Sequence, residues 1–240
     1  MQHVKYGPLH CHLTGGEDNR GAGAGPLLVL LHGFGAPGHD LVGLERALGL
    51  PRDVRVLYPE APHALGGPFG DGRAWWMLDL EALTRRAQGE VNDRSQEEPP
   101  GLADARDHLR ACLDAATAAL HPSNLVLGGF SQGSMLSCDF ALHDPRPLSA
   151  LLLLSSTLIA EQIWAPRVKS RAGLHVFQSH GRQDPVLPLS GAQQLSTLLS
   201  SGGLRLQEVL FDGGHEIPPP VLRALRDFIE QHVQPSTPPT

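Results

Sequence analysis

Six short apolar runs recur along this chain and constrain its fold more than any other feature. They are Leu27–Leu31, Val54–Tyr58, Leu125–Leu127, Ala150–Leu154, Leu174–Gln178 and Leu204–Leu210. Because the runs are largely continuous rather than alternating, they are typical of parallel strands buried on both faces. Stretches with helical spacing separate them, so strand and helix alternate from about Leu27 onward. The pattern predicts an α/β fold, with one mainly parallel, doubly wound sheet covered by helices on both faces.

Three of the intervening segments place apolar residues on one face of a helix. Their apolar positions are Leu41, Leu44, Ala47 and Leu48; Leu102, Ala105, Leu109, Cys112 and Leu113; and Leu222, Leu225, Phe228 and Ile229. We expect a single domain over residues 1–234 and a frayed tail over residues 235–240. Asp18–Gly25 is rich in glycine and predicts a turn that joins an N-terminal hairpin to the first central strand. The polar segment Gln88–Gly101 predicts a mobile surface loop.

Composition narrows the class of protein. Of the 240 residues, 41% are hydrophobic and 18% charged, which is enough apolar material for a sizeable core. The net charge is −6, with no basic stripe, so nucleic acid is a poor partner. Met1–His12 lacks the features of a secretory signal, and no apolar run approaches the roughly 20 residues of a membrane span. We therefore expect a soluble, cytoplasmic protein without stable membrane insertion. Its three cysteines, Cys11, Cys112 and Cys138, are an odd number at unrelated spacings and predict ordinary core residues in a reducing compartment.

The sharpest chemical signal is Gly129-Phe130-Ser131-Gln132-Gly133. It follows a predicted strand and precedes a segment, Ser134–Leu142, that can be helical. A G-x-S-x-G motif in this context predicts a tight strand-to-helix turn that lifts the serine hydroxyl at the carboxyl edge of the sheet. Ser131 is therefore the candidate nucleophile. The pattern alone is short enough to arise by chance, and its flanking strand and helix give it weight.

A serine nucleophile needs a base that is held by a third group. In this architecture the acid and then the histidine follow the serine, each just beyond a strand end. Asp184 follows the run Leu174–Gln178, and His215 follows the run Leu204–Leu210. Asp212 and Glu216 flank His215, but both are too close in sequence to reach the far ring nitrogen easily. We therefore expect Asp184 to orient His215, although an Asp before a Pro is also a common turn former.

Two backbone amides are expected to form an oxyanion hole. The Gln132 amide lies at the N-terminus of the helix that follows Ser131. The Phe34 amide belongs to the loop Leu30–Gly35 after an earlier strand. Hydrolases with a G-x-S-x-G turn place their second oxyanion donor in a loop of this kind. His32 in that loop is expected to brace it by hydrogen bonding rather than to transfer protons.

The same loop supports a rival function. Gly33–Gly38 (GFGAPG) matches the G-x-G-x-x-G fingerprint of dinucleotide-binding oxidoreductases, and Asp53 lies about 20 residues on. However, Asp53 precedes a strand where the ribose-binding acid should follow one, and Pro37 removes an amide from the phosphate cradle. A catalytically silent hydrolase fold that serves as an interaction module is a third alternative. His10 and His12 share a strand face, but no further ligand accompanies them at metal-binding spacing.

Several motifs together resemble the phospholipase/carboxylesterase family of small α/β-hydrolases, which includes acyl-protein thioesterases. They are LLHGFG at 30–35, YPEAP at 58–62, GFSQG at 129–133, HGRQDPVLP at 180–188 and GGHEIP at 213–218. The resemblance spans nearly the whole chain. It implies an α/β-hydrolase without a large lid domain, hydrolysis of carboxylic esters or thioesters, and no cofactor or metal. It also implies a triad of Ser131, Asp184 and His215, with the Phe34 and Gln132 amides as the oxyanion hole.

The substrate side departs from the family pattern. The loop Arg73–Leu80 contains two adjacent tryptophans and carries two extra residues before its acid. An aromatic, apolar loop beside a polar triad suits an acyl group. We expect Trp75, Trp76, Leu187 and Ile217 to contact the substrate, although one tryptophan of the pair should simply pack the loop onto the core. Esters of short to medium acyl chains are the expected class, and thioesters and lysophospholipids stay open.

Overall fold

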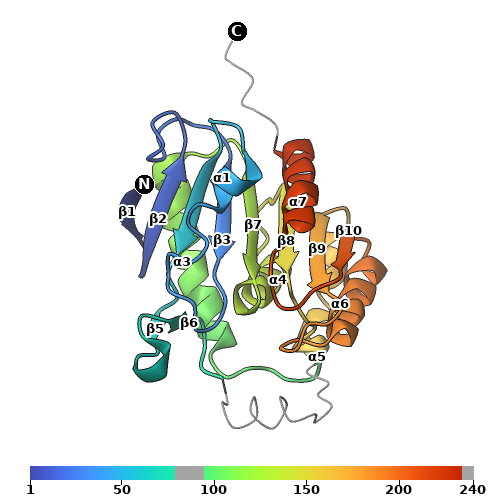
Figure 1. Cartoon of the computed structure of the whole chain (residues 1–240). Helices are drawn as coiled ribbons and strands as arrows, with labels where there is room; N and C mark the ends of the chain where they lie inside the picture. The colour runs from blue at the N-terminus through green and yellow to red at the C-terminus, as the bar shows by residue number, and fades with distance from the viewer. Residues whose placement is uncertain (79–94, 234–240) are drawn as a thin grey trace.

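A central sheet of eight strands organises the computed structural model, which describes residues 1–78 and 95–233 (Figure 1). The strand order is β1-β2-β4-β3-β7-β8-β9-β10. β1 and β2 form an antiparallel hairpin, β2 is antiparallel to β4, and all other pairs are parallel. The strands are β1 Gln2–Tyr6, β2 Leu9–Gly15, β3 Leu27–Leu31, β4 Arg55–Pro59, β7 Leu125–Phe130, β8 Ala150–Leu154, β9 His175–Gly181 and β10 Arg205–Phe211.

Helices and short elements connect these strands. The α-helices are α1 Leu44–Leu48, α3 Leu102–Leu120, α4 Gln132–His143, α5 Glu161–Trp164, α6 Leu189–Ser201 and α7 Pro219–His232. The 3₁₀ helices are η1 Gly67–Phe69 and η2 Val168–Arg171, and β5 His63–Ala64 pairs with β6 Arg73–Ala74 in a separate small sheet. Within residues 1–78 and 95–233, no helix is both long and apolar enough to cross a membrane.

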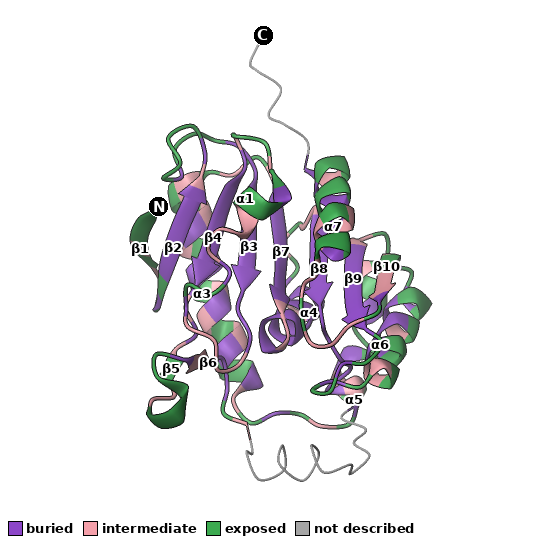
Figure 2. Ribbon diagram, in the orientation of Figure 1, coloured by how far each residue is buried: buried purple, intermediate pink, exposed green. Residues whose placement is uncertain are grey.

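Both faces of the sheet are covered, as the apolar runs predict. In β3, Leu27, Val29 and Leu31 pack into a cluster with residues of α3, α4 and α6. Leu28 and Leu30 point to the other face and pack with residues of α1 and α7. Figure 2 shows the central strands buried and the outer sides of the helices exposed. A strand buried on both faces has no polar side to alternate with, which explains its continuous apolar sequence.

The predicted strands are confirmed, with shifts at their ends. β7 continues three residues beyond Leu127, since Gly128 and Gly129 pair with β3 and β8. The sequence pattern missed this extension because the two glycines carry no apolar signal. A side chain at Gly128 would meet the Leu152 Cβ at 2.4 Å, so only glycine fits this close approach. The first predicted helix is reduced to the single turn α1, and Ala47 is exposed rather than on the buried face. Gly43 and Gly49 end that turn on either side, both with positive φ.

The predicted surface loop is only partly described. Residues 88–94 and the predicted frayed tail lie outside the described residues, and the one-domain boundary at residue 234 stays a prediction. The described end of the loop is attached to the start of α5. Ser95 O accepts a hydrogen bond from Glu161 N at 2.7 Å, and Glu97 O accepts one from Ala160 N at 2.9 Å. Residues 95–97 are therefore held against the core rather than free.

Candidate active site

Ser131 lies on a strained turn between β7 and α4. Its φ of 54° and ψ of −118° fall in a region that L-residues rarely adopt. The surrounding structure holds it there, because Ser131 N donates to Leu154 O at 2.9 Å and Ser131 O accepts from Ser134 N and Met135 N. These hydrogen bonds keep the strained serine between the strand end and the helix N-terminus, as the G-x-S-x-G motif predicts.

The two glycines of the motif are required by close approach. A side chain at Gly129 would meet the Leu31 O and the Gly133 backbone at 2.6 Å. One at Gly133 would meet Leu31 O at 2.2 Å. A Cβ added at Gly33 would lie 3.4 Å from the Ser131 Cβ. The turn Gly129–Gly133 (the elbow) and the loop after β3 are therefore in direct contact, with no room for side chains between them.

Asp184 and His215 come together from the ends of β9 and β10. His215 Nδ1 donates to Asp184 Oδ2 at 2.6 Å. The other carboxylate oxygen, Oδ1, accepts from Val186 N at 2.8 Å and from Leu187 N at 2.9 Å. Burial would raise the pKa of Asp184, but the hydrogen bond from His215 and those from the two amides outweigh it and lower this pKa. An ionised Asp184 fixes the proton of a neutral His215 on Nδ1 and leaves Nε2 as an acceptor.

Asp212 and Glu216, the other acids near His215 in the sequence, contact other groups. The Asp212 side chain is 88% exposed and lies 3.5 Å from Arg182 Nε. Glu216 Oε1 accepts from Gly214 N at 3.4 Å. In the described part of the chain, neither carboxylate is hydrogen-bonded to the ring of His215.

Two residues that the sequence interpretation did not assign support this pair. The Phe130 ring packs against the His215 ring, with centroids 4.7 Å apart. His180 is fully buried beneath Asp184, 3.6 Å from its Oδ2, and its Nε2 donates to Leu187 O at 2.8 Å. Burial lowers the pKa of His180, so it stays neutral. Both residues lie inside the quoted motifs, but nothing in their type or spacing indicates these contacts.

A mainly apolar pocket of about 220 Å³ is lined by several of the predicted site residues. Its lining is Phe34, Trp76, Leu78, Ser131, Gln132, Met135, Val186, Leu187 and His215. Six of these were predicted, whereas Leu78, Met135 and Val186 were missed. Ile217 does not line this pocket; it packs against the core cluster beneath α7. The expected substrate contact at Ile217 is therefore not supported by its position.

The two tryptophans have different roles. Trp76 lines the pocket, whereas Trp75 is fully buried behind it and donates from Nε1 to His32 O at 2.9 Å. The Gln132 side chain fastens this segment to the elbow. Its Oε1 accepts from Trp75 N at 2.9 Å, and its Nε2 donates to Trp76 O at 2.8 Å. Trp75 is thus the tryptophan that packs the loop onto the core.

The Phe34 and Gln132 amides are both available to a ligand. Among the residues that the structure describes, neither N–H has a hydrogen-bond acceptor. His32 braces the Phe34 loop, as expected: its Nδ1 donates to Gly33 O at 2.8 Å, and its Nε2 accepts from Ala61 N at 3.1 Å. Burial lowers the pKa of His32 and keeps the ring neutral, which this pattern of one donor and one acceptor requires.

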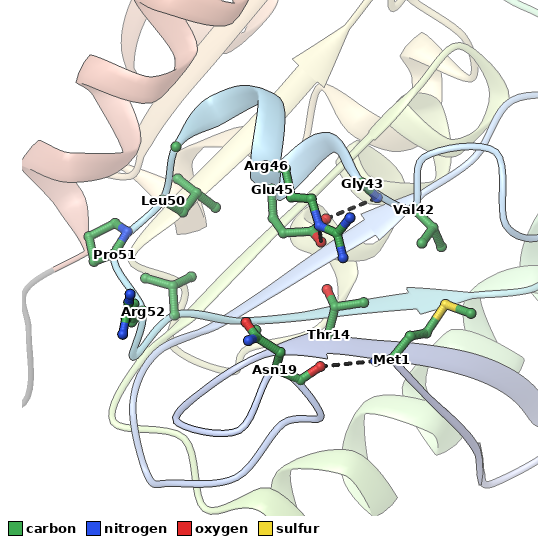
Figure 3. A pocket seen from close by; sticks show the side chains of 13 residues that line it. Met1, Thr14, Asn19, Val42, Gly43, Glu45, Arg46, Leu50, Pro51 and Arg52 are labelled. Atoms are coloured by element: carbon green, nitrogen blue, oxygen red, sulfur yellow. Dashed lines mark hydrogen bonds and ion pairs between the residues drawn. The ribbon is translucent and has the colours of Figure 1, made fainter.

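A larger cavity, of about 400 Å³, lies at the opposite edge of the sheet, where β4 begins (Figure 3). Its labelled residues include Thr14, Glu45, Arg46 and Arg52, and none of the predicted site residues lines it. The candidate side chains instead follow the carboxyl ends of the parallel strands, where α/β proteins place their sites.

The dinucleotide alternative is not supported by the loop after β3. A phosphate cradle needs the glycine loop to open directly into a helix N-terminus. Here α1 begins only at Leu44, six residues beyond Gly38, and a side chain at Gly38 would collide with Glu60.

The two histidines considered as metal ligands are not placed together. His12 Nε2 contacts Glu60 Oε1 at 3.1 Å, whereas His10 is exposed. Among the described residues, no three histidine, cysteine or acidic side chains are grouped so as to hold a metal ion.

The sheet topology and the position of the Ser131 pocket at the carboxyl ends of the parallel strands define a single-domain α/β-hydrolase. Residues 19–233 match the family model described as phospholipase/carboxylesterase, and the chain belongs to that family. It is therefore an esterase or thioesterase of the phospholipase/carboxylesterase family. The acyl-protein thioesterase 1 of Eremothecium gossypii is 35% identical over 223 residues, which are 88% of this chain and 89% of that protein.

Other relatives agree with this assignment. The acyl-protein thioesterase 1 of Emericella nidulans is 25% identical over 216 residues, covering 85% of this chain and 89% of that protein. The crystal structure of esterase PE8 superposes with a TM-score of 0.76 at 27% identity, covering 92% of this chain and 97% of that one. The carboxylesterase of Mesorhizobium loti shares the fold, with a TM-score of 0.75 at 20% identity over 95% of this chain and 97% of that one.

Proposed function

We propose that this protein hydrolyses carboxylic esters or thioesters through an acyl-enzyme on Ser131. Ser131 Oγ attacks the carbonyl carbon while His215 Nε2 takes the hydroxyl proton. His215 then gives that proton to the departing alcohol or thiol. Water repeats the sequence with the acyl group as its target and releases the acid. Asp184 holds the imidazole and stabilises its charged form, and the Phe34 and Gln132 amides bind the oxyanion.

The observation that carries this proposal is the Asp184–His215 hydrogen bond of 2.6 Å beside a pocket that also contains Ser131. Ser131, His215 and the backbone amides of Phe34 and Gln132, which have no acceptor among the described residues, make up the polar part of the pocket. The side chains of Trp76, Leu78, Met135, Val186 and Leu187 supply its apolar lining. These are the elements that acyl transfer needs, contributed by four separate segments of the chain.

The pocket has room for an acyl group of limited size. Its volume is about 220 Å³, and its lining is mainly apolar. We propose esters of short to medium acyl chains as the substrate class. A panel of p-nitrophenyl esters of increasing chain length, run beside an acyl thioester and a lysophospholipid, tests this. kcat/KM that keeps rising to the longest chains would contradict the size limit but leave the hydrolase mechanism intact.

The rate of hydrolysis should fall in acid. His215 must be neutral to accept the Ser131 proton. We expect kcat/KM for a p-nitrophenyl ester to fall as the pH is lowered from neutral into the acid range, because a protonated base cannot accept that proton. Asp184 stays ionised over this range because its pKa is lowered. A flat profile would contradict a histidine base.

The folding stability measured over the same pH range is the control for the rate measurement. Burial lowers the pKa of His32 and of His180, so the unfolded chain takes up protons at these positions before the folded protein does. Stability is therefore lost progressively as the pH falls below about 6.5. Tm should be measured at each pH, and the rates compared only where the protein stays folded.

Nicotinamide dinucleotides should not change the Tm of the protein. If the loop after β3 bound a dinucleotide, NAD(H) or NADP(H) far above its dissociation constant would raise Tm by mass action. We expect no shift with either nucleotide at near-millimolar concentration in a thermal melt. A clear shift together with absent esterase activity would revive the oxidoreductase alternative.

A further inference from the structure

Two of the three cysteines lie against each other in the core, although 101 residues separate them in the sequence. Cys11 is in β2 and Cys112 is in α3, and their sulfur atoms are 3.7 Å apart. Both side chains are at most 1% exposed. Cys138, in α4, is also buried and free, but it makes no comparable contact with another cysteine. The chain therefore contains one thiol pair and one single thiol.

The pair needs little movement to become a disulfide. A disulfide has its sulfur atoms about 2.0 Å apart, so each sulfur would have to move by somewhat less than about 1 Å. Strand β2 and helix α3 already face each other, and Figure 1 shows α3 running behind β2.

The position of the pair one strand in from the sheet edge provides a route for a small oxidant. β1 is the edge strand, and its residues are exposed or only half-buried. The turn between β1 and β2 lies directly on α3, since a side chain at Gly7 would meet Ala111 O at 2.8 Å and Cys112 N at 3.1 Å. Edge elements of this kind open at lower free energy than the central strands. A local opening of the hairpin would therefore give a small oxidant access to Cys11 on β2 and to Cys112 beneath the turn.

We propose that Cys11 and Cys112 are an oxidation site, which a small peroxide converts into an intramolecular disulfide. One thiolate attacks the peroxide O–O bond, takes one oxygen as a sulfenic acid and releases the other as water after protonation. The second thiolate then attacks the sulfenic sulfur and expels the remaining oxygen as water. The two sulfurs lose two electrons in total, which the peroxide oxygens accept. A thiol reductant reverses the bond.

The expected consequence is a hairpin fixed to the helix. The cross-link closes a loop of about 100 residues in the unfolded chain, which restricts that state strongly. The reaction should be slow in the closed protein. Contact with Cys112 and then burial raise the pKa of the Cys11 thiol, so little of the reactive thiolate is present until the hairpin opens.

The experiment treats the folded full chain with hydrogen peroxide and then counts thiols after unfolding. We expect the titratable thiols to fall from three to one and the intact mass to fall by two hydrogen atoms. A non-reducing peptide map should join the Cys11 and Cys112 peptides, and dithiothreitol should restore all three thiols. Tm of the oxidised protein should rise by about 5 °C or more.

Three variants make the test specific. Cys138→Ala should lose both of its remaining thiols just as the wild type loses the pair, whereas Cys11→Ala and Cys112→Ala should form no intramolecular bond. The wild-type peptide map decides the matter if either of the last two fails to fold. Three unreacted thiols, oxygen uptake without a cross-link, a bond that includes Cys138 or a bond between two chains would each overturn the proposal.

Discussion

Ser131→Ala should abolish hydrolysis of a p-nitrophenyl ester while leaving the fold intact. The proposed covalent acyl-enzyme requires the Ser131 hydroxyl, and removal of such a nucleophile lowers kcat by about 10⁶ in a comparable hydrolase. Alanine removes only one oxygen atom from the strained turn, so circular dichroism and Tm should change little. The measurement is kcat with the ester in excess, beside labelling of the wild type by a fluorophosphonate.

Ser134→Ala is the matched control. Ser134 is buried in the same turn, where its hydroxyl donates to Ser131 O at 2.6 Å, but it does not line the pocket. This variant should keep most of the activity and the single label. Labelling of the wild type at any other serine would show that the nucleophile was misassigned. A folded wild type with neither turnover nor label would instead support the silent interaction module.

Asp184→Asn should lower kcat by about 10⁴, the loss known for this change in a serine protease triad. Asn keeps the size of the side chain, and its oxygen can still accept from Val186 N and Leu187 N, so the turn should survive. Its NH₂ group cannot accept the proton on His215 Nδ1. The imidazole then favours the wrong tautomer and loses the charge that stabilises its protonated form.

Asp212→Asn and Glu216→Gln are the corresponding controls. Both acids lie next to His215 in sequence, but they contact Arg182 and Gly214 N instead. Each variant should therefore stay within a few-fold of the wild type when kcat is measured under the same conditions. If Asp212→Asn lost activity while Asp184→Asn kept it, the acid assignment would be wrong even with Ser131 and His215 retained.

The sequence could predict the framework because its signals are local. A run such as Leu27–Leu31 reports burial on both faces by its own composition, and the helical segments report one buried face by their spacing. The candidate triad followed from the same logic, because the motifs lie immediately after predicted strands. Parallel strands bring their carboxyl ends to one edge, so the order of Ser131, Asp184 and His215 already implied a common site.

The pocket wall could not be predicted in the same way. Trp75 and Trp76 are adjacent and identical in type, and only the structure shows that the Trp75 side chain is bonded to His32 O whereas Trp76 lines the pocket. Ile217 lies two residues from His215, yet it packs beneath α7. Met135, on α4 four residues beyond Ser131, lines the pocket instead.

The sequence by itself determined the six parallel central strands, part of their helical cover, the family motifs and the order of the candidate catalytic residues. These features depend on the hydrophobicity and backbone preferences of neighbouring residues, which a linear pattern records. Only the tertiary structure decided which tryptophan lines the pocket and that Cys11 contacts Cys112. Such contacts join segments as far as 101 residues apart, and they are set by how side chains pack once the sheet has formed.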